Sequence, residues 1–292
     1  DLDADDLLQN GPAVRIAANV GGGVLLGAAP ATLVATGDDD GDGVKNGDED
    51  DDGDGVKNRD DTDRDGDGVP DASETTASLT SLGGAPALLI GSTTNTVTLG
   101  AVGTGDAAYG LINRGTIVGS GLYSGVESRA VQLGVTGGQA VNVVGGVRNE
   151  GGISSTAVDA NATGVWIGSG VTAPTINNSG AIQAVASGKQ TQSATGILIG
   201  AGANVGSLTN TGNLVASFGG NQGSATVIRD QSGSLTQLNN AGSIIGSLTG
   251  FDDDLSSNAI EQYVSRLRRR LPTGACPGPR PGCPRAGRGR TR

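Results

Sequence analysis

Two short motifs that alternate along the chain, with a period of about 30 residues, limit this sequence to a repeat architecture. In the first motif, a hydrophobic residue, an asparagine, a glycine and a second hydrophobic residue occupy every second position. Its copies begin at Leu111, Val147, Ile176, Leu208 and Leu238, and their asparagines are Asn113, Asn149, Asn178, Asn210 and Asn240. The second motif is centred on Val131, Val165 and Ile197, with weaker copies at Thr226-Val227 and Ala259-Ile260.

Each motif alternates apolar with small or polar residues, which is typical of short β-strands. Such strands bury their apolar faces when successive repeats stack as coils about 4.8 Å apart. Aromatic residues make up 2% of the chain, so the core must be built from aliphatic side chains. We therefore expect inward ladders of aliphatic residues and a corner ladder of asparagines. Asparagine tolerates left-handed backbone there and passes amide hydrogen bonds along the axis, while the following glycine eases the bend.

An aspartate-rich block interrupts this pattern. Residues 38–74 hold 17 acidic and 4 basic residues. Three consecutive units fit the calcium-loop pattern D-x-D-x-D-G followed by five residues and an acid. Calcium requires six to eight oxygen ligands, and glycine at position six permits the sharp bend. The predicted ligands, including an oxygen donor at position nine and a valine carbonyl at position seven, are Asp38, Asp40, Asp42, Val44, Asn46, Glu49, Asp50, Asp52, Asp54, Val56, Asn58, Asp61, Asp63, Asp65, Asp67, Val69, Asp71 and Glu74.

Two other structures for this block are less consistent with its sequence. A solvated acidic linker would not require three units in register with glycine at each sixth position. A helix-loop-helix pair is disfavoured by the β-leaning flanks and by Pro70 inside the third loop. The block resembles bacterial thrombospondin type 3 repeats, with their D-x-D-G-D-G-V unit. That resemblance implies a string of calcium-wrapped loops with little hydrophobic core and, in this chain, without cysteines between the units.

The five asparagine motifs resemble those of bacterial autotransporter passenger domains. The resemblance implies an all-β, right-handed parallel β-helix, a solenoid with coils of about 30 residues, on the outer membrane. Pro12-Ala13-Val14-x-Ile16 is similar to Pro86-Ala87-Leu88-x-Ile90, which predicts that the calcium string is inserted between early coils. The expected segments are 1–37 for the N-terminal coil, 38–74 for the calcium string, 75–262 for the β-helix and 263–292 for a disordered tail.

Three interpretations remain open for the tail, in which residues 264–292 contain nine arginines and no acidic residue. The three are an arm for nucleic acid or an anionic surface, a small disulfide loop between Cys276 and Cys283, and an out-of-frame translation that replaces further coils and the barrel. The abrupt change in composition favours the third interpretation. No initiator methionine, signal peptide, transmembrane segment or translocator barrel is recognisable, so we expect the chain to be part of a longer product that carries such a barrel.

Catalysis is not expected. The chain has no histidine, which excludes histidine-based relays, and acidic residues are sparse in 80–262. Trp166 is predicted to point outward, beside Leu198 and Leu89 of equivalent strands, as a place where a sugar or partner could stack.

The sequence thus predicts a calcium-binding, surface-exposed or secreted bacterial β-solenoid that acts as an adhesin-like or structural spacer. Its expected partners are calcium ions and a host or neighbouring-cell surface or glycan, and nucleic acid is not expected. One alternative is a calcium-dependent polysaccharide lyase or hydrolase of β-helix fold. A second is a calcium-stiffened linker module of the cell envelope.

Overall fold

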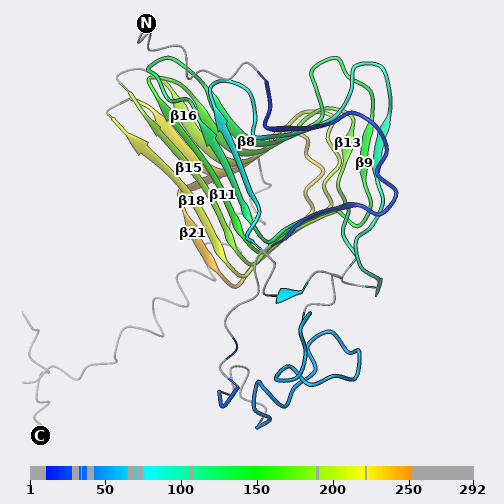
Figure 1. Cartoon of the computed structure of the whole chain (residues 1–292). Coiled ribbons are helices and arrows are strands. Elements are labelled where there is room, and N and C mark those ends of the chain that lie inside the picture. Colours follow the sequence, from blue (N-terminus) through cyan, green and yellow to red (C-terminus); the bar gives the residue numbers. More distant parts are fainter. Residues whose placement is uncertain are drawn as a thin grey trace, which may run out of the picture.

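The computed structural model of the chain describes residues 11–27, 33, 35–37, 43–64, 70–71, 75–105, 108–188, 191–220 and 222–250. In this part of the chain, parallel strands stack coil upon coil into a β-solenoid, as the two repeats predict (Figure 1). Among the described residues, no helix has the length and apolar composition needed to cross a membrane. The predicted repeat at Ala259-Ile260 and the arginine-rich tail lie outside the described residues.

Four parallel sheets form the sides of the solenoid. Sheet 1 contains β1 (Val14–Ile16), β4 (Leu88–Ile90), β8 (Ser128–Leu133), β12 (Ala162–Ile167), β16 (Ser193–Ile199), β19 (Ser224–Asp230) and β22 (Ser247–Thr249). Sheet 2 contains β2 (Val24–Leu26), β6 (Leu111–Asn113), β10 (Val147–Asn149), β14 (Thr175–Asn178), β17 (Ser207–Asn210) and β20 (Gln237–Asn240).

Sheets 3 and 4 complete each turn. Sheet 3 contains β3 (Ser78–Leu82), β7 (Thr116–Ser120), β11 (Gly152–Val158), β15 (Ala181–Ser187), β18 (Asn213–Gly219) and β21 (Ser243–Ile245). Sheet 4 contains β5 (Val97–Leu99), β9 (Val141–Val143) and β13 (Val171–Thr172). The chain visits the sheets in the order 1, 4, 2, 3, so each strand pairs with its equivalent in the next coil.

The predicted inward ladders form the core. In sheet 2, the first residues of the asparagine motifs pair in register from Leu111 to Leu238, and the first four are buried. In sheet 1, Val131, Val165 and Ile197 pair in register and are also buried. The stacking of aliphatic side chains on aliphatic side chains lets a chain with few aromatics exclude water from its interior.

The alignment at the fourth copy of the second motif is corrected by one residue. The sequence pattern equates Val227 with Ile197, but Ile197 pairs with Ile228. Val227 instead occupies the position of Gly196, where an added Cβ would lie 2.6 Å from the Val227 carbonyl oxygen. Both Val227 and Ile228 are fully buried. The sequence pattern could not distinguish them because both are apolar and adjacent.

The asparagines form the predicted ladder at the corner between sheets 2 and 3. Each Nδ2 donates to the Oδ1 of the next asparagine at 2.7 Å, along the series Asn113, Asn149, Asn178, Asn210 and Asn240. From Asn149 onward, the same Nδ2 also donates to the carbonyl oxygen two residues ahead. The backbone reason given for asparagine is wrong, because none of these five residues has a positive φ.

The glycines of the same motif have a different role from the one that the sequence suggested. Their φ angles are not left-handed. A Cβ at Gly151, Gly180 or Gly212 would instead lie 2.0–2.1 Å from a backbone oxygen of the preceding coil. Glycine is therefore required at this corner because successive coils approach too closely for any side chain.

Candidate calcium-binding loop string

The aspartate-rich block leaves the solenoid at one corner of the first coil. It connects β2 to β3, whereas later coils join sheets 2 and 3 with a two-residue turn. The Ala77 N–H donates to the Gly27 carbonyl oxygen at 2.9 Å, so the two ends of the insert meet. Figure 1 shows the described part of the string, in blue, outside the stacked sheets. We call residues 38–74 the loop string.

The three units share one backbone hydrogen bond. In each unit, the N–H at position nine donates to the carbonyl oxygen of the residue that precedes the loop. The pairs are Asn46 with Gly37 at 2.9 Å, Asn58 with Glu49 at 2.8 Å, and Asp71 with Thr62 at 2.8 Å. The units defined by sequence spacing therefore share this backbone contact at the same position.

The second unit is described in full and brings three predicted ligands together. Carboxylate oxygens of Asp50, Asp52 and Asp54 all lie within 4.8 Å of one another. Asp50 is held by the N–H groups of Gly53 at 2.9 Å and Gly55 at 3.0 Å, one on each carboxylate oxygen. The loop backbone thus orients its own acidic side chains.

Asp52 and Asp54 are oriented in the same way. Asp52 Oδ1 accepts from the Asp54 N–H at 3.0 Å, and Asp54 Oδ1 accepts from the Val56 N–H at 2.7 Å. Gly43 and Gly55, the described glycines at position six, have φ angles of 92° and 94°. The predicted need for glycine at this bend is confirmed for both loops, because a left-handed φ strains other residues.

The electrostatics of the second loop reflect this concentration of negative charge. The Asp54 N–H lowers the pKa of Asp52. Desolvation and the charges of Asp54, Asp61 and Asp50 outweigh that hydrogen bond and raise the pKa above its ordinary value. Asp61, at position twelve, therefore contributes to the same electrostatic site. Its Oδ2 atom is buried and accepts no hydrogen bond from the described residues.

The side chains at position nine of the second and third loops hold the loop backbone through hydrogen bonds. Asn58 Oδ1 accepts from the Asp51 N–H at 3.0 Å, and its Nδ2 donates to the Asn46 carbonyl oxygen at 2.8 Å. Asp71 occupies the equivalent place in the third unit: its Oδ1 accepts from the Arg64 N–H at 2.9 Å, and its Oδ2 pairs with Arg64 Nε at 2.6 Å. Desolvation raises the pKa of Asp71, but these hydrogen bonds and the Arg64 charge bring the net shift below the ordinary value.

The sequence reasoning did not single out the basic residues between the loops. Lys57 Nζ and Arg59 Nη1 lie 3.1 Å and 2.6 Å from Asp48 Oδ1. The Lys57 hydrogen bond, opposed by desolvation and assisted by the charges of Arg59, Lys57 and Lys45, lowers the pKa of Asp48. Asp48 stands at position eleven, where the calcium-loop pattern sets no ligand, so these cations neutralise an acid outside the predicted ligand set.

The remaining predicted ligands are placed as follows. Val44 and Val56, whose carbonyls are the predicted ligands, are 41% and 39% exposed. Asn46 is buried, and Glu49 and Asp63 are half-buried. Asp38, Asp40, Asp42, Asp65, Asp67, Val69 and Glu74 lie outside the described residues. Calcium ligation by any of these residues stays a prediction.

The donor set of the second loop fits a hard divalent cation. It offers carboxylate oxygens at positions one, three, five and twelve, and its fold places the first three close together. Oxygen donors in a flexible loop are the ligands that calcium prefers. Without a cation, the same carboxylates repel one another, which is the effect seen in the pKa of Asp52.

Comparison with protein-family models, with curated proteins and with solved structures gave no significant match.

Proposed function

We propose that this chain is a rigid, surface-exposed or secreted bacterial spacer whose loop string becomes ordered when it binds calcium. In this proposal the solenoid is a fragment of an autotransporter passenger domain, and the loop string belongs to the thrombospondin type 3 kind. The observation that carries the proposal is the convergence of the Asp50, Asp52 and Asp54 carboxylates within 4.8 Å, with Asp61 acting on the same site.

The energetic role of calcium follows from the composition of the string. Its described residues supply few buried apolar side chains, and its acidic residues repel one another. A bound cation replaces that repulsion with several charge-assisted contacts, so binding and ordering are coupled. Exported proteins meet enough calcium to fill sites with dissociation constants of about 10⁻⁴–10⁻³ M.

The solenoid body suits a spacer for a separate reason. Its asparagine ladder and aliphatic ladders run continuously across the coils, so bending would break hydrogen bonds and packing in every sheet. The described residues of the loop string take no part in these contacts. We therefore expect the body to keep its β-structure when calcium is removed, while the string loses its order.

The test is calorimetric titration of calcium into the full chain after treatment with a chelator. The unchanged chain is expected to bind at least two calcium ions. The triple variant Asp50→Asn, Asp52→Asn and Asp54→Asn is expected to bind about one fewer. The double variant Asp51→Asn and Asp60→Asn is the control, because it removes acidic residues of the same loop from positions that are not predicted ligands.

Equal loss of binding in the control would show general ion condensation and contradict the ligand assignment. A stoichiometry below two in the unchanged chain would contradict the tandem sites. Circular dichroism on the same samples tests the spacer. Global loss of β-structure on chelation would contradict a body that is stable without calcium.

A further inference from the structure

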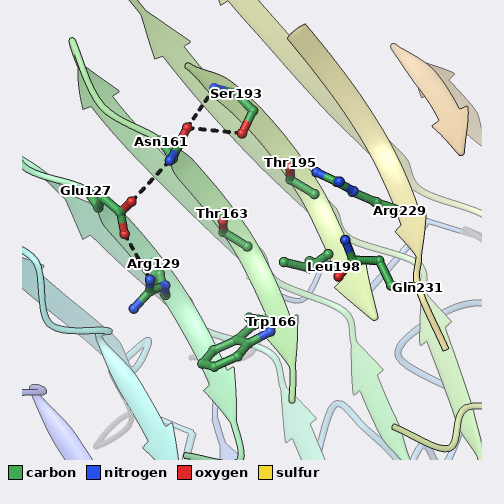
Figure 2. Close-up of a pocket in the computed structure, with 10 residues that line it drawn as sticks. All are labelled: Glu127, Arg129, Asn161, Thr163, Trp166, Ser193, Thr195, Leu198, Arg229 and Gln231. Carbon is green, nitrogen blue, oxygen red and sulfur yellow. Dashed lines mark hydrogen bonds and ion pairs between the residues drawn. The ribbon is translucent and has the colours of Figure 1, made fainter. Parts of the chain in front are cut away.

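The outer surface of sheet 1 contains a shallow groove of about 390 Å³ that crosses β8, β12 and β16 and reaches the residues at the end of β19 (Figure 2). Its side chains alternate with the buried core positions of the same strands. Val165 and Ile167 point into the core, while Thr163 and Trp166 line the groove. The outward position predicted for Trp166 is therefore confirmed, and Leu198 pairs with it in register.

Trp166 is the single tryptophan of the chain and lies at the junction of two cavities. The second cavity, of about 360 Å³, is lined by Trp166, Gly168 and Gly200, among others. A Cβ on Gly168 would lie 3.6 Å from Trp166 Cζ2, and one on Gly200 would lie 3.5 Å from Nε1. These glycines leave the space beside the indole open. The indole N–H donates to none of the described residues, so it is available to a ligand.

The groove gathers positive charge on a chain whose formal net charge is −11. Arg129 lies over the Trp166 ring, with its guanidinium carbon 5.4 Å from the ring centroid, and pairs with Glu127 at 2.9 Å. Arg229 is exposed and forms no ion pair within the described part of the chain. Glu127 is the one carboxylate that lines the groove, and its charge is already balanced by Arg129.

The acid next to Arg229 in sequence does not neutralise it. Asp230 is 5% exposed and points to the opposite face of β19. Its Oδ1 accepts from the N–H and hydroxyl of Ser232 at 2.8 and 2.7 Å, and its Oδ2 accepts from the Leu235 N–H at 3.3 Å. The Arg229 guanidinium therefore remains as an uncompensated cation at one end of the groove.

We propose that this groove binds an acidic polysaccharide, with Trp166 stacking against a sugar ring and Arg229 pairing with its carboxylate. Asn161 Nδ2 donates to Glu127 Oε1 at 3.1 Å, and the Ser193 hydroxyl donates to Asn161 Oδ1 at 3.1 Å. The Thr163 hydroxyl, the Ser193 hydroxyl oxygen and the second Nδ2 hydrogen of Asn161 remain for hydrogen bonds to sugar hydroxyls. The shallow, open shape suits an extended chain that lies across several coils. The ligand site is on the solenoid body and does not depend on the loop string, so it goes beyond the proposed calcium function.

A protein partner fits this groove less well. Protein interfaces are anchored by clusters of apolar and aromatic residues in well-packed pockets, and here Trp166 and Leu198 are the large apolar side chains in the lining. Among the described residues that line the groove, Glu127 is the one acid, and its ion pair with Arg129 leaves no free carboxylate for glycan hydrolysis. The lining is accordingly that of a binding site.

The experiment uses the full chain and the fluorescence of Trp166, which reports on the groove without a label. Oligogalacturonate is titrated in the presence of EDTA, which removes calcium effects, and neutral dextran oligomers of similar length serve as the comparison. We expect saturable quenching by oligogalacturonate and none by dextran. Arg229→Gln should weaken binding about tenfold, because it removes a charge-assisted hydrogen bond. Arg148→Gln, which removes an arginine from sheet 2, should leave affinity unchanged.

Trp166→Leu, followed by calorimetry, should abolish binding while the circular dichroism spectrum stays the same. Absence of quenching and of heat with oligogalacturonate would overturn the proposal. Equal weakening by Arg148→Gln, or equal binding of a polyglutamate peptide, would also overturn it, because either result would mean nonspecific attraction of anions. None of these results bears on calcium binding, which is measured separately.

Discussion

Asn113 Nδ2 donates to Asn149 Oδ1 at 2.7 Å, across 36 residues of sequence. The two side chains occupy the same corner of successive coils, and the pattern continues to Asn240. Asn113 is the first member, and its Oδ1 is buried without a hydrogen-bond partner in the described structure. The residue in register with it on the preceding coil is Leu26, which has no donor to offer. The ladder therefore begins one coil after the coil that carries the loop string.

Removal of an internal member of the ladder should destabilise the solenoid more than removal of its last member. Asn178→Ala breaks two ladder bonds, because it removes the donor to the buried Asn210 Oδ1 and the 2.7 Å acceptor of Asn149 Nδ2, which should cost about 2–4 kcal/mol. Asn240→Ala breaks one ladder bond, together with a 3.3 Å bond to the Gly242 carbonyl oxygen, at a half-buried site and should cost about 1 kcal/mol. Urea unfolding curves measure the difference. Equal costs would mean that the ladder does not act as a continuous series.

The corner glycines should not tolerate alanine. In Gly180→Ala, the new Cβ would lie 2.1 Å from the Gly151 carbonyl oxygen, so the coils must separate. We expect a loss of about 2–3 kcal/mol from this overpacking. The matched control is Gly22→Ala, where a Cβ meets nothing within 4 Å, and the change should be neutral or slightly stabilising. Thermal unfolding of both variants checks the prediction, and a tolerated Gly180→Ala would argue against the close stacking.

Extension of the ladder into the first coil should partly compensate for the loss of an apolar side chain. Leu26→Asn places a carboxamide in register with Asn113, whose Oδ1 lacks a donor. We expect this variant to be more stable than Leu26→Ala by about 1–2 kcal/mol, because the amide satisfies a buried acceptor. Chemical denaturation distinguishes the two variants. If they were equally stable, the Asn113 oxygen would have another source of hydrogen bonds, such as solvent.

Calcium affinity should fall as the pH is lowered from about 7 to about 4.5. Against the hydrogen bond from the Asp54 N–H, desolvation and the neighbouring charges raise the pKa of Asp52. It therefore takes up a proton at a higher pH than an isolated aspartate, and that proton competes with calcium. In the calcium-free string, the order of the loop changes with pH in the opposite direction. A pKa that is raised in the folded loop makes the loop less stable at higher pH, and this cost is lost as the pH falls through the folded-state pKa. Calcium titrations at several pH values measure the first effect.

The second effect appears in the order of the calcium-free string, which should increase as the pH falls through the same range. Amide hydrogen exchange at residues 43–64 reports on it. The triple asparagine variant supplies the control, because it has no carboxylates at these three positions to titrate. A calcium affinity that is independent of pH across this range would contradict binding by carboxylates.

Much of the fold could be predicted because a solenoid repeats its packing. Leu111 and Val147 occupy equivalent positions in sequence and also in space, so the sequence period gives the register directly. The failures occurred where neighbouring residues are chemically alike or where contacts involve the backbone. Val227 and Ile228 are both hydrophobic, so the pattern does not show which of them continues the ladder. The close approach at Gly180 is to the backbone of the preceding coil, so the residues around Gly180 do not reveal it.

The loop string shows the same division. The spacing of Asp50, Asp52 and Asp54 predicts their convergence, because alternate residues of a tight loop turn to one side. The spacing does not show that Asn58 braces the Asp51 amide or that Arg64 pairs with Asp71, because those contacts depend on how the loop closes. Asp61 stands at the last position of the loop, and its charge still helps to raise the pKa of Asp52.

The sequence by itself determined that this chain stacks short strands with an aliphatic interior and an asparagine corner, because both properties follow from periodic chemistry along the chain. The tertiary structure decided which glycines are needed for the close approach of coils and where the loop string leaves the solenoid. It also brought Arg129, Trp166 and Arg229 into one groove, although they belong to three different coils. Such relationships depend on the distance between coils, which the sequence spacing alone does not specify.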